Sequence, residues 1–426
     1  MTHHNAIKFI KNAPNVTPKD ESAAERIQTL CAALGNPQKK IKYIRLAGSN
    51  GKTVCARMLI SILNKSEIKN GCLSMPMYSE IQDNVRIDGT PISMEEIVEH
   101  VSAIKAAVDG INAERTDDSS VFHPTAHEIL LCMALLTFVA HKCEICIIES
   151  DHNGEDPSKF LPAPFAAVIC GTIPNEDRDR QDVYKIRSYI YRGVKEIISA
   201  PQNTEAYKII ADTCYSVNCR LTLAVKNNID IQRLTLGGTT FLYKDNEYSL
   251  KVCGKFQTVN AAVAIESADM LTRFGYNISK QNIKDGLLAV NAPCKFEILS
   301  LSPIIIADST HTPIAIEAVC ESLADFKEIT GTNIKLCLPD GELIGHYTEI
   351  LDKQGYTVDK ISVLEIPELS EDRITGASTP INLLKTVKAT AKDALSELNG
   401  NSTLLISGPS NFTRQLRHEL LNILGF

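Results

Sequence analysis

The feature that most constrains the fold of this 426-residue chain is the stretch GSNGKT at positions 48–53. It follows a short apolar run at 43–46 and precedes a segment, 54–64, in which apolar residues recur at helical spacing. A strand, a glycine-rich turn and a helix N-terminus in this order form an anion site, because backbone N–H groups and the helix dipole point at one place. The stretch therefore predicts a loop that binds a nucleotide phosphate.

The chemistry expected of this loop belongs to two side chains. Lys52 would reach the β- and γ-phosphates, and the hydroxyl of Thr53 would bind Mg²⁺. The first glycine of the usual pattern is replaced by Leu46, so Gly51-Lys52-Thr53 is a partial match. The alternative is an ordinary strand-to-helix turn with an exposed lysine.

Strands alternate with helical segments through most of the chain, which predicts an α/β fold with a parallel sheet covered on both faces. In such sheets ligands bind at the carboxyl ends of the strands. Glu149 ends the predicted buried strand 145–149, so we expect it at the same edge as the loop. The alternative is a strand-end acid in solvent.

The length of the chain indicates two domains, because a single core stops growing at about 250–300 residues. Residues 1–293 are predicted to form the first, including a region at about 229–253 whose alternating polarity is typical of antiparallel hairpins. Asn291-Ala292-Pro293 is the predicted linker. Strand and helix patterns restart over 294–426 and predict a second, smaller, Rossmann-like α/β domain.

Composition argues against several classes of protein. The formal net charge of −7 and a pI near 5.9 argue against a nucleic-acid or anionic-membrane partner. No apolar run approaches the length of a bilayer span, and the N-terminus has no signal-peptide pattern. The thirteen cysteines are then expected to be reduced thiols in the cytoplasm. For the close pair Cys143 and Cys146, burial is favoured over metal binding, because no second Cys/His pair has fitting spacing.

Several short motifs occur in order along the chain: LGNP at 34–37, AGSNGK at 47–52, PTAHE at 124–128, GKFQTVNA at 254–261, PCKFE at 293–297, DSTHTP at 308–313 and ISG at 406–408. Each is weak alone, but their order and spacing are jointly specific. Through most of its length, though patchily, the chain resembles folylpolyglutamate synthase, a member of the Mur ligase superfamily. The resemblance implies an N-terminal P-loop ATPase domain with a parallel sheet and a smaller C-terminal ligase domain.

Members of this family use ATP to phosphorylate a substrate carboxylate, and an amino-acid amine, typically that of glutamate, then displaces phosphate to form an amide. The resemblance therefore implies an ATP-dependent acid–amino-acid ligase that needs Mg²⁺, takes small-molecule substrates and is a monomer. It implies that Lys52 and Glu149 serve catalysis and that Thr53, Glu149 and Glu176 bind the metal. The nucleotide contacts that it implies are Gly48, Ser49, Asn50, Gly51, Lys52, Thr53, Asn260, Lys295, Asp308 and His311.

Several of these assignments have a structural alternative. Asn260 could cap its predicted helix, 260–274, because asparagine is a favoured N-cap. Asp308 and His311 could be ordinary turn residues after a strand. Lys295, which stands where the family has arginine, could be a solvated surface charge.

The likeness fails at the family's metal and acyl-phosphate motifs. The serine of the family's TSPHL is replaced by Met75, which cannot bind a hard cation, and Ser74 substitutes for it only if the loop shifts. The family's glycine-rich segment after the strand-end glutamate is replaced at 150–156, and its carbamylated lysine aligns with Tyr191. Polar residues are nevertheless gathered where a metal would be needed: Asp151, His152, Asp156, Glu176, Asp177 and Asp179.

Two functions stay open. In the first, the chain is a working ligase whose carboxylate substrate and metal geometry differ from those of the folate enzymes. In the second, it is a divergent homologue that binds nucleotide, or nothing, without ligation. The retention of Lys52, Thr53 and Glu149 together favours the first.

Overall fold

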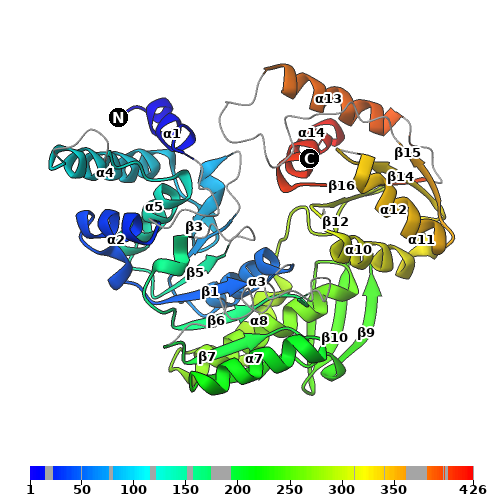
Figure 1. The fold of residues 1–426 in the computed structure, drawn as a ribbon. Coiled ribbons are helices and arrows are strands. Elements are labelled where there is room, and N and C mark those ends of the chain that lie inside the picture. Colours follow the sequence, from blue (N-terminus) through cyan, green and yellow to red (C-terminus); the bar gives the residue numbers. More distant parts are fainter. Residues whose placement is uncertain are drawn as a thin grey trace. The chain divides into compact units, whose positions relative to one another are not determined.

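The computed structural model describes residues 1–14, 23–48, 50–75, 80–115, 121–150, 157–173, 193–310, 312–339, 341–360, 381–396, 398 and 402–425. The chain divides into two compact units, Met1–Lys226 with Asn260–Leu287 and Asn227–Val259 with Leu288–Phe426. Figure 1 labels the elements of both. The hairpin region that the sequence places in the first domain belongs to the second unit, which resumes at residue 288 rather than 294.

One sheet organises the first unit. Its described strands number eight, in the order β4 (Thr90–Pro91), β3 (Val85–Ile87), β2 (Asn70–Leu73), β5 (Ile145–Glu149), β1 (Tyr43–Ala47), β6 (Ala166–Ile169), β7 (Glu196–Ser199) and β8 (Arg220–Leu223). From β2 to β8 all neighbours are parallel, and β3 and β4 add an antiparallel hairpin at one edge. Every residue of β1 and β5 is buried, as in central strands with both faces covered. The predicted parallel α/β fold is confirmed.

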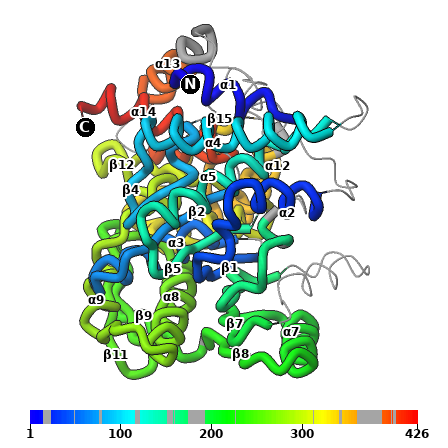
Figure 2. Tube along the Cα trace, turned by 90° about the vertical axis from the view of Figure 1, so that its left-hand side faces the viewer, coloured from blue at the N-terminus to red at the C-terminus, as the bar shows by residue number. Residues whose placement is uncertain are grey.

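The described helices that lie wholly or partly in this unit are α1 (His3–Lys11), α2 (Ala23–Ala33), α3 (Lys52–Lys65), α4 (Met94–Ala113), α5 (Ala126–Ala140), α7 (Thr204–Ser216), α8 (Lys255–Arg273) and α9 (Lys280–Leu288). The nearly all-buried α5 shares one apolar core with α1, α2, α4 and the strands beside them, and Figure 2 shows α1, α4 and α5 together. α3 packs on β1, β2 and β5, while α7 packs against β6 and β7. Among the described helices, none has the length and apolar content that crossing a bilayer needs.

The second unit contains a three-stranded antiparallel sheet, β9 (Ile229–Thr235), β10 (Gly238–Tyr243) and β11 (Asn246–Leu250). A turn follows β10, and Lys244 and Asp245 there both have positive φ, as a tight two-residue hairpin turn requires. A further turn at Leu236 and Gly237 separates β9 from β10.

A second α/β sheet has the described strand order β12 (Glu297–Leu301), β13 (Ile304–Asp308), β16 (Ser402–Ser407), β14 (Asn333–Cys337) and β15 (Thr357–Lys360). The last four are parallel and β12 is antiparallel to β13. Two apolar cores lie on its two faces, one with α10 (Pro313–Asp325) and α12 (Gly341–Lys353), the other with α13 (Ile381–Ser396) and α14 (Ser410–Leu424). The predicted Rossmann-like character of this part is confirmed.

Candidate functional site

The glycine-rich loop joins β1 to α3 as predicted. Gly48 and Gly51 have φ of +114° and +83°, values that favour glycine. A Cβ at Gly48 would lie 2.0 Å from the Cys170 carbonyl oxygen, and one at Gly51 would lie 2.5 Å from Asn260 Oδ1. Both positions therefore need glycine for conformation and for space.

The lysine of the loop is not the exposed side chain of the structural alternative. Lys52 is only 7% exposed, and its Nζ donates a 2.8 Å hydrogen bond to Gly48 O. It is also the first residue of α3, whose N-cap Gly51 has no side chain to satisfy the first-turn N–H groups. The ammonium group and these N–H groups together suit an anion such as phosphate.

Glu149 is fully buried at the carboxyl end of β5, so the solvent-exposed alternative is wrong. Its Oε2 accepts a 2.9 Å hydrogen bond from Thr53 Oγ1, and its Oε1 accepts a 2.8 Å bond from Ser74 Oγ. β1 pairs with β5 so that Leu46 lies beside Glu149, and β2 flanks β5 on its other side. The sheet thus brings three oxygen-bearing side chains together at one edge.

Burial raises the pKa of the Glu149 carboxyl above its ordinary value, because desolvation penalises the charged form. Hydrogen bonds from Ser74 and Thr53 oppose this shift, as does the nearby charge of Lys52. A cation beside this carboxylate would favour the ionised form.

The residues present fit Mg²⁺ chemically. This hard ion prefers oxygen ligands and is usually held by one or two carboxylates together with water and substrate phosphates. Glu149, Thr53 and Ser74 offer one carboxylate and two hydroxyls. No group of three or more His, Cys, Asp or Glu side chains suited to a metal occurs among the residues that the structure describes. One carboxylate with two hydroxyls matches the way Mg²⁺ is held together with water and substrate phosphates.

Ser74 is the site residue that the sequence named only conditionally. It follows directly on β2, and the neighbouring Met75 is buried in the apolar core of α4 and α5. The structure thus places the serine next to Glu149. Its position directly after a short apolar strand was the signal that could have found it.

Asn260 lies within α8, which begins five residues earlier than predicted, so the helix-cap alternative is wrong. Its main-chain oxygen and its Oδ1 lie 3.6 and 3.8 Å from Cys55 Sγ. Since its Oδ1 also faces the Cα of Gly51, Asn260 borders the loop.

Lys295 and Asp308 belong to the second unit. Asp308 ends β13, is 2% exposed, and accepts a 2.6 Å hydrogen bond from Phe296 N, so it is no solvent-exposed turn residue. Lys295 is half-buried between Cys294 and Phe296, which have φ of +57° and +55°. Left-handed backbone at non-glycine residues costs about 1–3 kcal/mol each and tends to occur at functional sites.

Other predicted site residues lie outside the described residues: Ser49, Glu176 and His311, and with them Asp151, His152, Asp156, Asp177, Asp179 and Tyr191. All thirteen cysteines are described and are free thiols, with Cys146 buried in β5.

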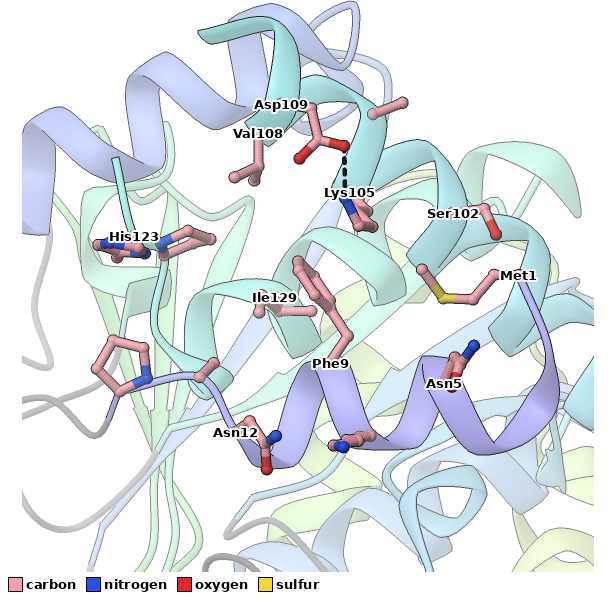
Figure 3. Close-up of a pocket in the computed structure, with 15 residues that line it drawn as sticks. Met1, Asn5, Phe9, Asn12, Ser102, Lys105, Val108, Asp109, His123 and Ile129 are labelled. Atoms are coloured by element: carbon pink, nitrogen blue, oxygen red, sulfur yellow. Dashed lines mark hydrogen bonds and ion pairs between the residues drawn. The ribbon is translucent and has the colours of Figure 1, made fainter. Parts of the chain in front are cut away.

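A cavity of about 750 Å³ lies elsewhere in the first unit, between α1, α4 and residues 123–129. Figure 3 shows Phe9 and Ile129 at its centre and the Lys105–Asp109 ion pair on one wall. None of its lining residues belongs to the glycine-rich loop, and Thr53, Ser74 and Glu149 are not among them. It is therefore a separate feature.

Comparison of the sequence with known proteins identifies distant relatives. No family model matches the chain. It is 23% identical over 378 residues to the folylpolyglutamate synthase of Lacticaseibacillus casei, covering 86% of each protein. It is 24% identical over 324 residues to the dihydrofolate synthase/folylpolyglutamate synthase of Bacillus subtilis, covering 70% of this chain and 71% of that protein.

Solved structures agree with these relatives. The apo form of the L. casei enzyme matches with a TM-score of 0.79 at 20% identity, over 100% of both chains. A folylpolyglutamate synthase complex with AMPPCP and folate matches with a TM-score of 0.78 at 20% identity, over 99% of this chain and 100% of the other. Over most of its length the chain is therefore similar to folylpolyglutamate and dihydrofolate synthases, and it has the fold of the solved folylpolyglutamate synthases.

Proposed function

We propose that this protein is an ATP-dependent ligase that joins an amino acid, glutamate by analogy with its relatives, to the carboxylate of a folate-type substrate. The observation that carries the proposal is the convergence of Thr53, Ser74 and Glu149 beside the Lys52 loop. It combines a phosphate site with an oxygen-lined cation site at the ligand-binding edge of a parallel sheet.

The reaction needs no protein nucleophile. A substrate carboxylate oxygen attacks the γ-phosphorus of ATP, and the bond from that phosphorus to ADP breaks. The amine nitrogen then attacks the acyl carbon, phosphate leaves with the bonding electrons, and the amine loses a proton. Catalysis is therefore positioning and stabilisation of the charge on the transferring phosphoryl group.

Each residue of the cluster has a role in this scheme. Lys52 and the first-turn N–H groups of α3 hold the phosphates, and Thr53 and Glu149 hold Mg²⁺, with Ser74 as a further oxygen. Mg²⁺, when bound, neutralises phosphate charge. Ser74 thus replaces the family serine that Met75 displaced, and Glu176 stays a proposed additional ligand.

We assign nucleotide binding to the first unit and the ligase role to the second. Gly48, Ser49, Asn50 and Gly51 would line the phosphates, with Asn260 on the adenine side. Lys295, Asp308 and His311, in the second unit, stay predicted nucleotide contacts from the resemblance. By the same resemblance, the protein acts as a cytoplasmic monomer.

The alternative function is nucleotide binding without ligation. It is favoured by Met75, which lies in the apolar core where relatives have a hydroxyl that helps to bind metal. A ligase for a non-folate carboxylate is a third outcome of the same assay.

The test is phosphate release from Mg·ATP with a panel of folates and other carboxylates, each with glutamate or another amino acid. We expect turnover with a folate and glutamate. Lys52→Ala should weaken ATP binding about 10–100-fold by calorimetry, because it removes a charge-assisted hydrogen bond. Lys105→Ala is the matched control, since that lysine pairs with Asp109 on the exposed face of α4. Equal ATP affinity for wild type and Lys52→Ala would exclude the nucleotide site, and no turnover with any pair would favour the alternative.

A further inference from the structure

One buried asparagine holds the main chain of Ser74. Asn84, the last residue of the short 3₁₀ helix η2 (Ile81–Asn84), is 0% exposed. Its main-chain oxygen accepts a 2.8 Å hydrogen bond from Ser74 N, and its side-chain Nδ2 donates a 2.7 Å bond to Ser74 O. The N–H and the C=O of Ser74 are therefore both bonded to the same residue.

The order of the strands explains why these residues meet. β2 lies between β3 and β5, and its last residue, Leu73, pairs with the first residue of β3 and with Ile148 of β5. Ser74 follows Leu73 and lies between Asn84 on one side and Glu149 on the other, to which its Oγ donates a 2.8 Å bond. Asn84 and Glu149 thus hold Ser74 from opposite sides.

The amide of Asn84 is a polar group next to apolar residues. Ile81 and Val85, near it in the chain, and Met75, which follows Ser74, all belong to the apolar core of α4 and α5. A buried amide costs free energy unless it is hydrogen-bonded. The bond to Ser74 O satisfies the amide and also fixes the main chain of the serine. Rotation about the Cα–Cβ bond is then the main freedom left to the serine hydroxyl.

The position of this hydroxyl matters for a cation. Mg²⁺ requires nearly ideal octahedral geometry, with oxygen ligands at about 2.0–2.1 Å. A small displacement of Ser74 would therefore take its Oγ out of reach of an ion held by Glu149 and Thr53. Residues that orient metal ligands affect metal affinity for this reason, although they do not touch the metal.

We infer that Asn84 is a positioning residue: it holds Ser74 so that the serine hydroxyl is directed at Glu149 in the candidate cation site. The hold on Ser74 stands on the hydrogen bonds, and its consequence for Mg²⁺ rests on the proposed function. In this role Asn84 touches neither the nucleotide nor the reacting atoms.

The test compares Asn84→Ala with Asn70→Ala. Asn70 is also 0% exposed and begins the strand that Ser74 follows. Its Nδ2 donates bonds of 2.7 Å to Asn64 Oδ1 and 3.0 Å to Ile68 O. Both variants remove a fully buried amide, but only Asn84→Ala removes a bond to Ser74. Asn84→Ser, whose side chain is too short to make this bond, repeats the test if the alanine variant does not fold.

Hydrogen exchange on the full chain without ligand tests the hold on Ser74. We expect the Ser74 amide to exchange about fivefold faster in Asn84→Ala, because the loss of one buried hydrogen bond makes local opening easier. Asn70→Ala should leave this amide within about twofold of wild type. Equal exchange of the Ser74 amide in wild type and Asn84→Ala would overturn the inference.

Calorimetry with a non-hydrolysable ATP analogue, with and without Mg²⁺, tests the consequence for the cation. In Asn84→Ala the affinity with Mg²⁺ should fall about 10-fold. The affinity without Mg²⁺ should stay within about twofold of wild type, because Lys52 and the first-turn N–H groups of α3 still bind the phosphates. Asn70→Ala should change neither value.

Ser74→Ala should lose at least as much of the affinity with Mg²⁺. The double variant Ser74→Ala/Asn84→Ala should add little to it, because both residues act through one hydroxyl. An equal loss of affinity with and without Mg²⁺ in Asn84→Ala would mean that this variant disturbs the phosphate loop, and the inference would be wrong.

These measurements separate two failures. If Mg²⁺ does not tighten binding of the analogue to wild type, the proposed cation site fails, while the exchange of the Ser74 amide still decides whether Asn84 holds the serine. If Mg²⁺ tightens binding equally in wild type and Asn84→Ala although exchange is faster, Ser74 does not bind the cation. The metal half of the inference is then wrong, and the proposed function stands on Thr53 and Glu149.

Discussion

Glu149 is the central residue of the candidate site in the first unit. It is fully buried, accepts hydrogen bonds from Thr53 and Ser74, and lies within the field of Lys52. We expect such a group to make the stability of the folded protein depend on pH and, under the proposed function, to make its activity depend on a cation.

The first prediction concerns Glu149→Gln and pH. Burial raises the folded-state pKa above the ordinary value of 4.5, so the folded protein holds this proton more tightly than the unfolded chain. The free energy of unfolding therefore falls as pH rises from about 4.5 through the folded-state pKa of Glu149. Below about pH 4.5 this group does not change it. Glu149→Gln should remove this loss, so urea unfolding should show a smaller fall in stability above pH 4.5 than in wild type. An identical pH profile in the two proteins would contradict this.

The same variant should lose activity. Without the carboxylate, Mg²⁺-dependent phosphate release should fall by at least about 100-fold, since even outer-shell partners of metal ligands cost 10–100-fold. The measurement is kcat/KM for ATP over a Mg²⁺ titration. Activity within threefold of wild type would place the metal elsewhere.

A second prediction concerns glycine. Gly51→Ala places a Cβ 2.5 Å from Asn260 Oδ1 at positive φ, so it should destabilise the protein by about 1–3 kcal/mol and weaken ATP binding. Gly110→Ala, in α4 with open space around it, should instead stabilise by about 0.5–1 kcal/mol. Chemical unfolding of both variants measures the contrast, and equal effects would show that the loop is not strained.

At the residue scale the sequence predicted the loop and Glu149, because a glycine-rich turn and an acid after a buried strand are local patterns. It predicted Ser74 only conditionally, because the contact joins β2 to β5 across 75 positions. Which strands are neighbours is a property of the sheet that no local pattern carries.

At the scale of elements, α5 is held by its N-terminus. Thr125 and Glu128 form a capping box, and Glu128 also makes a two-pronged ion pair with Arg26 of α2. Glu128 is 1% exposed. One carboxylate thus closes a helix and joins two helices.

The third prediction follows from this carboxylate. Glu128→Ala should cost about 3 kcal/mol of unfolding free energy, because it leaves the nearly buried Arg26 without its charge partner and removes a cap. Glu95→Ala on α4, whose side chain is 78% exposed beside His3, should change stability by less than about 0.5 kcal/mol. A loss below about 1 kcal/mol for Glu128→Ala would mean that Arg26 finds water instead.

Elements with strong local periodicity were predicted well, as β1, α3 and α5 show. For α12 the sequence pattern predicts a helix only over 348–353, because Gly341 and Gly345 weaken the helical pattern ahead of it. Gly345 destabilises the helix by about 1 kcal/mol relative to alanine. The packing of Leu343 and Tyr347 in the core outweighs this cost. β8 and β15 were missed because short strands, half-exposed in the case of β8, carry little pattern.

At the scale of the whole molecule, the chain has two compact units with separate cores. The sequence predicted two α/β parts but placed the hairpin region with the first. At residue 260 the chain returns to the first unit. No change in composition marks this position, because α8 runs through it without interruption. Unfolding of such a chain is not expected to be two-state.

The fourth prediction is made at this scale. Mg·ATP at 100 times its Kd should stabilise the nucleotide-binding unit by about 2.7 kcal/mol, by mass action. Calorimetry should show a transition that moves up with ATP in wild type. In Lys52→Ala, whose ATP affinity is expected to be about 10–100-fold weaker, the same ATP concentration should stabilise this unit by only about 0.4–1.4 kcal/mol. A shift of equal size in both proteins would mean that ATP binds outside the loop.

The bond from Lys52 Nζ to Gly48 O bears on how quickly a nucleotide can be captured. This bond already joins the two ends of the loop, so an arriving phosphate replaces one oxygen acceptor of the ammonium group by another and adds little to the order of these residues. The loss of conformational entropy when the nucleotide binds is then small. The rate of nucleotide association should be limited by diffusional encounter and by the loss of water from the phosphates. Solvent viscosity should change this rate only through its effect on diffusion.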